Sequence, residues 1–286
     1  MSEIKIPMDH PLEFDTPYAH IVVFDRKRKR EPIRVYLQSG AYGSASFLRE
    51  KKRNELVFNY LKAFDSLFSY VDGRKLLLIG GAGYQYPKYI ISHYPDKRID
   101  VVEIDPDSLK IAREYFFLND CLLQYDDPEN PRFRSFCDDG RAFMKGCLER
   151  RDRTYDIIYN DAFGSYFPAP RLATKEAAGL AMELLNPGGL YVCNTLGAPK
   201  GSRGRFLRSE YRTLTQVFPY VYCLPVRSDE KSRDGYSNHV LIASREALDL
   251  KGTLPLKPEP DDIVFADNEK PGVHITEMVM GNYYGH

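Results

Sequence analysis

Glycines and carboxylates recur in this sequence where short apolar runs end. The run Lys75–Ile79 leads directly into glycines at Gly80, Gly81 and Gly83. The next apolar run ends on Glu103 and Asp105. Glycines let a backbone approach a ligand without an intervening Cβ, and a carboxylate at the next strand's end can accept hydrogen bonds from ribose hydroxyls. The spacing therefore predicts a nucleoside-binding βαβ unit.

The glycine pattern also distinguishes between nucleosides. A dinucleotide fingerprint has a third glycine three residues after the second, and here that position is Tyr86. The close approach to a pyrophosphate is therefore not provided for. A nucleoside without phosphates, such as S-adenosylmethionine or a relative, needs no such glycine, so we favour a sulfonium nucleoside over NAD. A strand, turn and helix with no ligand is the alternative.

Two further apolar runs end on polar groups. Asp138, Asp139 and Gly140 follow one run, where an acid can accept from an adenine amino group. Asp161 follows the other run, so its carboxylate emerges from a buried strand into the cleft. A carboxylate base that accepts the proton of an attacking amine contributes ~10²–10⁴-fold to a rate. Asp161 is our candidate base; the alternative is an acid that caps a helix or orders a loop.

An alternation of strand-like and helix-like runs must hold these groups in place, as in a doubly wound α/β sheet with a Rossmann-like fold. We expect helices at about residues 86–94, 106–117, 140–150, 174–185 and 203–217. We expect seven strands, at Leu76–Ile79, Asp100–Ile104, Phe133–Cys137, Asp156–Asn160, Leu190–Asn194, Val221–Val226 and His239–Ala243. The last two have no helix-sized gap between them and should form an antiparallel hairpin at the sheet edge.

The remainder of the chain divides around this sheet. We expect a small N-terminal β-domain with its linking helix at 1–70, a nucleoside-binding domain at 71–250 and a tail at 251–286. We expect the tail to be either an arm packed on the body or a strand that binds a partner. Within the first part we expect an irregular lead-in at residues 1–17, strands at His20–Asp25, Pro32–Gln38 and Ser44–Leu48, and an amphipathic helix at Glu50–Tyr70.

The composition limits the classes of protein to which the chain can belong. The 286 residues are 43% hydrophobic and carry a net charge of +0, enough for a real core and without a strong pull toward nucleic acid or membrane. The five Cys are scattered and form no ligand spacing with His, so we predict reduced thiols, no metal site and a cytoplasmic location. We read the basic run Arg26–Arg30 as a solvated hairpin tip.

The chain resembles the spermidine synthase, or polyamine aminopropyltransferase, family from about residue 18 to 245. The resemblance rests on five motifs: residues 76–83, 102–105 (Val-Glu-Ile-Asp), 138–143 (Asp-Asp-Gly-Arg-Ala-Phe), 155–161 and 185–189 (Leu-Asn-Pro-Gly-Gly). It implies a donor that is S-adenosylmethionine or its decarboxylated form, a product such as methylthioadenosine or S-adenosylhomocysteine, and a homodimer.

The resemblance also implies residue roles. Glu103 would bind ribose, Asp139 would bind adenine, and Asp161 would deprotonate the attacking amine. We expect the nucleoside to be bound by Gly80, Gly81, Gly83, Glu103, Ile104, Asp105, Asp139 and Gly140.

Three departures from the family pattern affect the acceptor. Gly83 stands where the family's glycine loop has an Asp against the aminopropyl ammonium, and the loop after Asp161 lacks the family's second acid. The segment Arg49–Glu55 is matched to a family helix start, with arginines in place of an acid and a tyrosine. A polyamine carries two or three positive charges, and truncating one partner of a buried charge pair costs about 2–5 kcal/mol.

Three functions stay open on this basis. The first is transfer of a methyl or other alkyl group from an S-adenosyl donor to a small non-polyamine acceptor, with aminopropyl transfer to a polyamine as its alternative. The second is a non-catalytic nucleoside-binding or scaffold protein. The third and weakest is modification of nucleic acid, based on the basic runs at 26–30 and 49–53 and on Arg203, Arg205 and Arg208.

Overall fold

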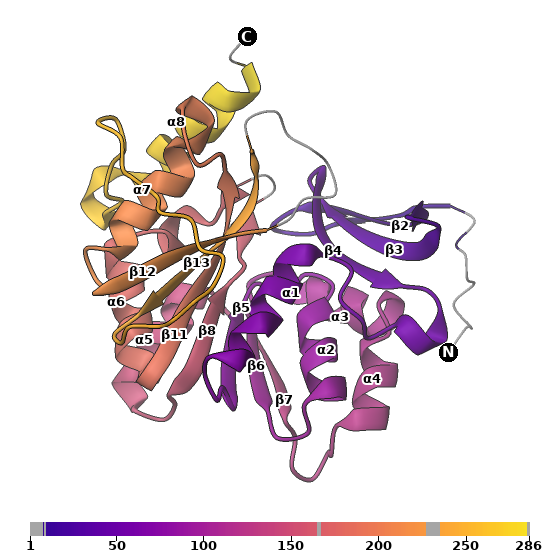
Figure 1. Ribbon diagram of the computed structural model, residues 1–286. Helices are drawn as coiled ribbons and strands as arrows, with labels where there is room; N and C mark the ends of the chain where they lie inside the picture. Colours follow the sequence, from indigo (N-terminus) through magenta and orange to yellow (C-terminus); the bar gives the residue numbers. More distant parts are fainter. Residues whose placement is uncertain (1–7, 9, 165–166, 227–234, 285–286) are drawn as a thin grey trace.

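The computed structural model describes Met8 and residues 10–164, 167–226 and 235–284. Two sheets organise it (Figure 1): a small one made by the N-terminal segment and a large one with helices on both faces. The division at 1–70, 71–250 and 251–286 stays a proposal.

The N-terminal sheet has four antiparallel strands in the order β1-β2-β3-β4. They span β1 Leu12–Asp15, β2 His20–Arg28, β3 Glu31–Gln38 and β4 Ala41–Phe47. The basic run turns at Lys29 and Arg30, whose φ values are 47° and 69°, so it is the hairpin tip that the sequence predicts. The expected irregular lead-in is wrong for Leu12–Asp15, because this segment pairs with β2; residues 1–7 and 9 lie outside the described residues.

The single helix expected at Glu50–Tyr70 is wrong. A 3-10 turn, η1 (Glu50–Lys52), is followed by extended chain, then by α1 (Asn59–Ser66) and a second 3-10 turn, η2 (Leu67–Ser69). The extended stretch has a physical reason: Leu56 packs in the core of the large sheet while its neighbour Val57 packs under the N-terminal sheet. Adjacent side chains reach opposite sides only in extended chain.

The basic residues before α1 are paired on the surface. Arg49 and Lys52 both contact Glu31, and Arg53 lies 3.6 Å from Asp120. The segment Arg49–Glu55 contains the turn η1, and its match to a family helix start stays a prediction. Its arginines pair with Glu31 of the N-terminal sheet and with Asp120 of helix α4 (Leu118–Tyr125).

The large sheet has seven strands in the order β12-β13-β11-β8-β5-β6-β7. Six are parallel, and β13 runs antiparallel between β11 and β12, which confirms the expected hairpin at the edge. The strands span β5 Lys75–Ile79, β6 Arg98–Glu103, β7 Phe133–Cys137, β8 Tyr155–Asn160, β11 Leu185–Gly197, β12 Tyr220–Pro225 and β13 Ser237–Ser244.

Helices cover both faces of this sheet and bury one apolar cluster on each. Helices α1, α2 and α4 pack on one face, where Ile90 and Leu118 are fully buried. On the other face lie α5, α6 and α7, with Met144 and Leu207 fully buried. The helices span α2 Gln85–His93, α3 Pro106–Tyr115, α4 Leu118–Tyr125, α5 Gly140–Arg150, α6 Lys175–Leu184 and α7 Arg205–Leu214. The sequence did not indicate α4.

Two buried cations tie the N-terminal sheet to the large domain. Arg34 forms a bidentate pair with Asp25 and donates to the carbonyl of Tyr115 at the end of α3. Lys88 in α2 donates to Ser46 Oγ at 2.7 Å and to the backbone carbonyls of Arg53 and Phe116. Burial lowers the pKa of Lys88 to about 7. These contacts seat the small sheet directly on the helix that follows the glycine loop.

The tail is an arm that packs on the body and ends in a helix, α8 (Pro271–Tyr284), so the alternative of a partner-binding strand does not hold. Arg208 of α7, 2% exposed, forms a buried pair with Asp262 of the arm, whose side chain is 0% exposed. Arg205 donates to the carbonyl of Asp261, and Arg203 lies over the ring of Tyr236. These arginines hold protein segments, which removes their support for a nucleic-acid site.

We predict that Asp262→Ala destabilises the protein by about 1.5–3 kcal/mol, because the buried Arg208 guanidinium then keeps only the half-exposed Glu259 as a carboxylate partner. Denaturant unfolding of purified protein measures this. Asp261→Ala changes the exposed neighbour and is the matched control, expected within about 0.5 kcal/mol of the parent. Equal unfolding midpoints for the two variants would show that the arm is not anchored by this pair.

Candidate functional site

The parallel strands bring four sets of polar groups to one edge of the large sheet. β5 lies between β6 and β8, so the chain leaves β5 at the point where the strand order reverses. Ligands of such sheets bind at this edge, outside the carboxyl ends of the strands. The glycine loop, Glu103, Asp139 and Asp161 all follow strands that end here.

Gly80 brings the glycine loop against the loop that carries Asp161. Its φ is +96°, and a Cβ at this position would lie 2.6 Å from the carbonyl oxygen of Asp161. Any side chain there would collide with backbone. The two loops are also joined by a hydrogen bond of 2.9 Å from the amide of Asp161 to the carbonyl of Ile79. The donor side and the Asp161 side of the site are thus in contact through the main chain.

Glu103 is held in place by the glycine loop. Its Oε2 accepts from the amides of Gly81 and Ala82 at 2.7 and 3.0 Å, and its Oε1 accepts from the amide of Asp105 at 2.9 Å. A carboxylate has about four lone-pair sites, so the three backbone bonds orient the group and leave capacity for a ribose hydroxyl. Ile104, next along the chain, is 39% exposed and offers an apolar surface at the same strand end.

The structure gives Asp105 and Gly140 roles within the fold. Asp105 is 4% exposed; its Oδ1 accepts from the amide of Asp107 and its Oδ2 from Thr16 Oγ1, so it caps α3 and holds the N-terminal segment. A Cβ at Gly140 would lie 2.3 Å from Ile79 Cγ2, so this glycine allows α5 to pack closely on β5. Both residues remain predicted nucleoside contacts, although their roles in the fold account for an aspartate and a glycine at these positions without a ligand.

Asp139 caps α5 and faces a nearby cation. Its Oδ1 accepts from the amide of Ala142 at 2.9 Å, and its Oδ2 lies 3.8 Å from Arg171. Asp138, beside it, is exposed. One oxygen of Asp139 therefore keeps capacity to accept from an adenine amino group.

Asp161 lies between two neutral hydrogen-bond donors. The hydroxyl of Tyr60 donates to Oδ2 at 3.0 Å, and Asn194 Nδ2 donates to Oδ1 at 2.8 Å. Asn194 in turn accepts from Asn238 Nδ2 at 2.9 Å, which fixes the orientation of its amide. Burial raises the pKa of Asp161 to about 7, although both hydrogen bonds act to lower it. A carboxylate with a pKa near the working pH suits a general base.

The sequence did not indicate the two side chains that donate to Asp161, Tyr60 and Asn194, or Asn238, which donates to Asn194. Asn194 ends the expected strand Leu190–Asn194, so the strand-end argument applied to Asp161 could have found it. Asn238 lies one residue before the expected strand at His239, on the antiparallel β13. The sequence pattern makes Tyr60 one of the apolar residues of the helix expected at Glu50–Tyr70, and its place beside Asp161 depends on where α1 begins. Burial raises the pKa of Tyr60 well above that of an ordinary tyrosine, so it stays a donor.

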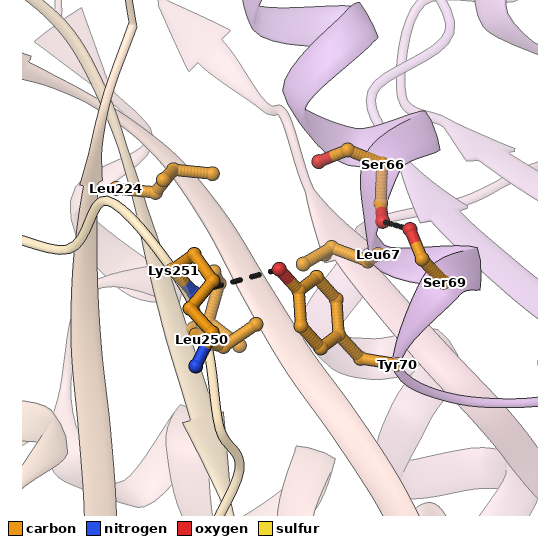
Figure 2. Close-up of a pocket in the computed structure, with 8 residues that line it drawn as sticks. Ser66, Leu67, Ser69, Tyr70, Leu224, Leu250 and Lys251 are labelled. Carbon is orange, nitrogen blue, oxygen red and sulfur yellow. Dashed lines mark hydrogen bonds between the residues drawn. The ribbon is translucent and has the colours of Figure 1, made fainter.

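A small cavity lies elsewhere, between the end of α1 and β12 and β13 (Figure 2). It has a volume of about 110 Å³ and is lined by Ser66, Leu67, Tyr70, Leu224 and Leu250, among others. Ligand pockets measure about 300–1,000 Å³, so this cavity is too small for a nucleoside.

Among the residues that the structure describes, no helix combines the length and the apolar character that a membrane span needs.

Comparison with known proteins agrees with this arrangement. The model of the spermine/spermidine synthase domain matches residues 64–228, more than half of the chain. The chain belongs to this family. The matched segment contains the glycine loop, Glu103, Asp139, Asp161 and Asn194, which are the groups gathered at the sheet edge.

Individual relatives cover different shares of the chain. The polyamine aminopropyltransferase of Hamiltonella defensa is 30% identical over 141 residues, 49% of this chain and 46% of that protein. The polyamine aminopropyltransferase of Vibrio vulnificus is 25% identical over 232 residues, 81% of this chain and 72% of that protein. A probable spermidine synthase from Corynebacterium glutamicum has a crystal structure with a TM-score of 0.64 at 22% identity, covering 96% of this chain and 88% of that one. That structure confirms the fold.

We predict that Tyr60→Phe raises the pKa of Asp161 above its value of about 7, because the carboxylate loses one of the two hydrogen bonds that favour its charged form. Titration of ¹³C-labelled aspartate carboxyls by NMR measures this, with the signal assigned by its loss in Asp161→Asn. Tyr18→Phe, at a tyrosine that is 53% exposed, is the control and should leave the signal unchanged. An unchanged pKa in Tyr60→Phe would contradict the role of this hydroxyl.

Proposed function

We propose that the protein transfers an alkyl group from an S-adenosyl sulfonium donor to an amine, with Asp161 as the base. The observation that carries this proposal is the Asp161 carboxylate, which burial poises near neutral pH and which two neutral donors orient beside the glycine loop. Family membership supports the class of reaction, because the relatives matched are named as aminopropyl transferases.

The donor side of the site fits a nucleoside. Glu103 is oriented by three backbone amides toward the position of a ribose. Ile104 offers an exposed apolar surface for an adenine ring, and Asp139 has an oxygen for its amino group. The glycine loop admits the ligand without a Cβ at Gly81. We propose these four residues as the donor contacts.

The reaction requires one proton acceptor and one fixed direction of approach. The amine lone pair attacks the carbon bonded to the sulfonium, a C–N bond forms, the C–S bond breaks, and the donor leaves as a neutral thioether. The amine proton passes to Asp161. Holding the nucleophile and the carbon in line lowers the barrier by on the order of 7–11 kcal/mol. The main-chain contact between the Gly80 and Asp161 loops contributes to this alignment, because it fixes the two halves of the site relative to each other.

Aminopropyl transfer from decarboxylated S-adenosylmethionine to a polyamine is the reaction that the relatives' names favour. We propose it as the first candidate, ahead of the methyl transfer that the sequence alone favours. A homodimer is likewise proposed on the resemblance to this family.

Methyl or other alkyl transfer to a non-polyamine acceptor is the second candidate, and Gly83 favours it. A Cβ at Gly83 would lie 2.8 Å from Ser44 Cβ and 3.3 Å from Phe116 Cδ1. The N-terminal sheet therefore occupies the space that an acid at this position would need. Gly164, three residues after Asp161, stands at the position of the family's second acid and offers no carboxylate either.

We predict that Asp161→Asn lowers kcat by about 10²–10⁴-fold, because the amide cannot accept the proton of the amine. The dissociation constant of the donor should change little, since Asp161 lies on the acceptor side. Steady-state assays of thioether release and calorimetry with the donor measure the two quantities. Asp96→Asn, at an exposed surface acid, is the control. Full turnover in Asp161→Asn would show that Asp161 is not the base, whereas donor binding without turnover in the parent would favour the non-catalytic role.

A second experiment separates the two candidate donors. We predict that calorimetry detects binding of decarboxylated S-adenosylmethionine and of methylthioadenosine, and that putrescine is consumed when the decarboxylated donor is supplied. If S-adenosylmethionine alone binds, and a methyl group reaches another amine, the second candidate replaces the first. Failure of all three nucleosides to bind would contradict the donor site itself.

A further inference from the structure

The C-terminal arm touches the loops that follow both strands of the Asp161 site. Asp161 follows β8, and its partner Asn194 belongs to β11. After β8 the chain forms a short hairpin, β9 (Phe163–Gly164) and β10 (Phe167–Pro168), and a 3-10 turn, η3 (Pro170–Leu172). After β11 it forms the turn η4 (Ser202–Gly204). Helix α8 contacts β10, η3 and η4, and Figure 1 shows it beside α7.

The arm is first fastened to α7. The buried pair of Arg208 and Asp262 joins the two segments. Two hydroxyls of α7 then accept from arm amides: Ser209 Oγ from Ile263 at 3.1 Å and Thr213 Oγ1 from Phe265 at 2.9 Å. This side of the arm is fixed independently of α8.

From this anchor the arm holds the loop after β11. Glu259 Oε1 accepts from the amide of Gly201, and Arg208 Nη1 donates to the carbonyl of the same residue at 2.9 Å. Gly201 immediately precedes η4, so both polar groups of its backbone are tied to the arm's anchor.

The arm also holds the segment after β8. Ile275 and Met278 of α8, 0% and 5% exposed, pack with Ala173, which directly follows η3, and with Phe206 and Phe265. The carbonyl of Phe265 accepts from the amide of Lys175 at 2.9 Å, where α6 begins. The segment that links Asp161 to α6 is thus packed against the same helix as the loop after β11.

We propose that the C-terminal arm, residues 259–278, is a positioning element of the Asp161 site. It joins the segment that follows Asp161 to the loop that follows Asn194, and so it holds these two loops together and limits the access of water to the carboxylate. The register of Asp161 and Asn194 is set by the pairing of β8 with β11, where Asn160 lies opposite Cys193. The inference rests on the role proposed for Asp161. In this arrangement Ile275 is a positioning residue, and no residue of the arm needs to touch the substrate.

Ile275→Ala tests this, because it opens a space where α8 meets the segment after β8. We expect hydrogen exchange to speed up in both loops, at residues 167–174 and 201–204, and the pKa of Asp161 to fall from about 7 toward the ordinary range, because burial is its largest cause and water now enters. In turnover, the acceptor KM should rise and kcat fall by on the order of 10-fold, with the donor dissociation constant unchanged.

Val273→Ala, at the 52% exposed position of the same helix, is the matched control and should behave as the parent. Ile275→Val should restore most of the loss. If Ile275→Ala does not fold, Met278→Ala replaces it.

Faster exchange in the loops with an unchanged pKa of Asp161 overturns the proposal, as does faster exchange in one loop alone. A parent protein that binds the donor but alkylates no amine overturns the proposed function, and the exchange and titration data still decide the role of the arm.

Discussion

The site depends on one close approach, between the backbone of Gly80 and the backbone of Asp161. The switch point of the sheet places the loops after β5 and β8 side by side, and only a residue without Cβ fits between them. The loop proposed to bind the nucleoside and the loop that bears the proposed base are then in contact through their main chains. In the proposed reaction, a donor held by the first loop presents its reactive carbon to the second.

Neutral groups surround the base in this arrangement. Tyr60 and Asn194 each give one hydrogen bond to Asp161 and carry no charge, so they orient the carboxylate without fixing it in its ionised form. An arginine in either position would hold the charged form and lower the basicity of the group. Burial then sets the proton affinity. Burial has the largest effect on the pKa of Asp161 and raises it, while the two hydrogen bonds that orient the carboxylate act to lower it.

The sequence predicted the large sheet well because its strands are buried on both faces and end on glycines or acids, as at Ile79 and Asn160. It failed where local period and tertiary packing disagree. Leu56 and Val57 fit a helical pattern, but they pack into two different clusters and require extended chain. Asn194 followed a recognisable strand end, whereas Tyr60 became a site residue only through the position at which α1 starts. The packing of the C-terminal arm on the body depends on pairs of residues far apart in the sequence, such as Arg208 with Asp262, and no local pattern reveals such pairs.

Lys88 has a consequence for the response of the fold to alkali. Its pKa is about 7 in the native protein, against 10.5 for an ordinary lysine, so between these values the unfolded chain binds the extra proton. Unfolding therefore takes up a proton at this position, and by linkage the contribution of Lys88 to the free energy of unfolding rises as the pH increases through that interval. Below pH 7 both states are protonated, and the cost of the buried ammonium is present in full. The desolvation cost of the ammonium at the junction between the small sheet and α2 is thus removed under mildly basic conditions.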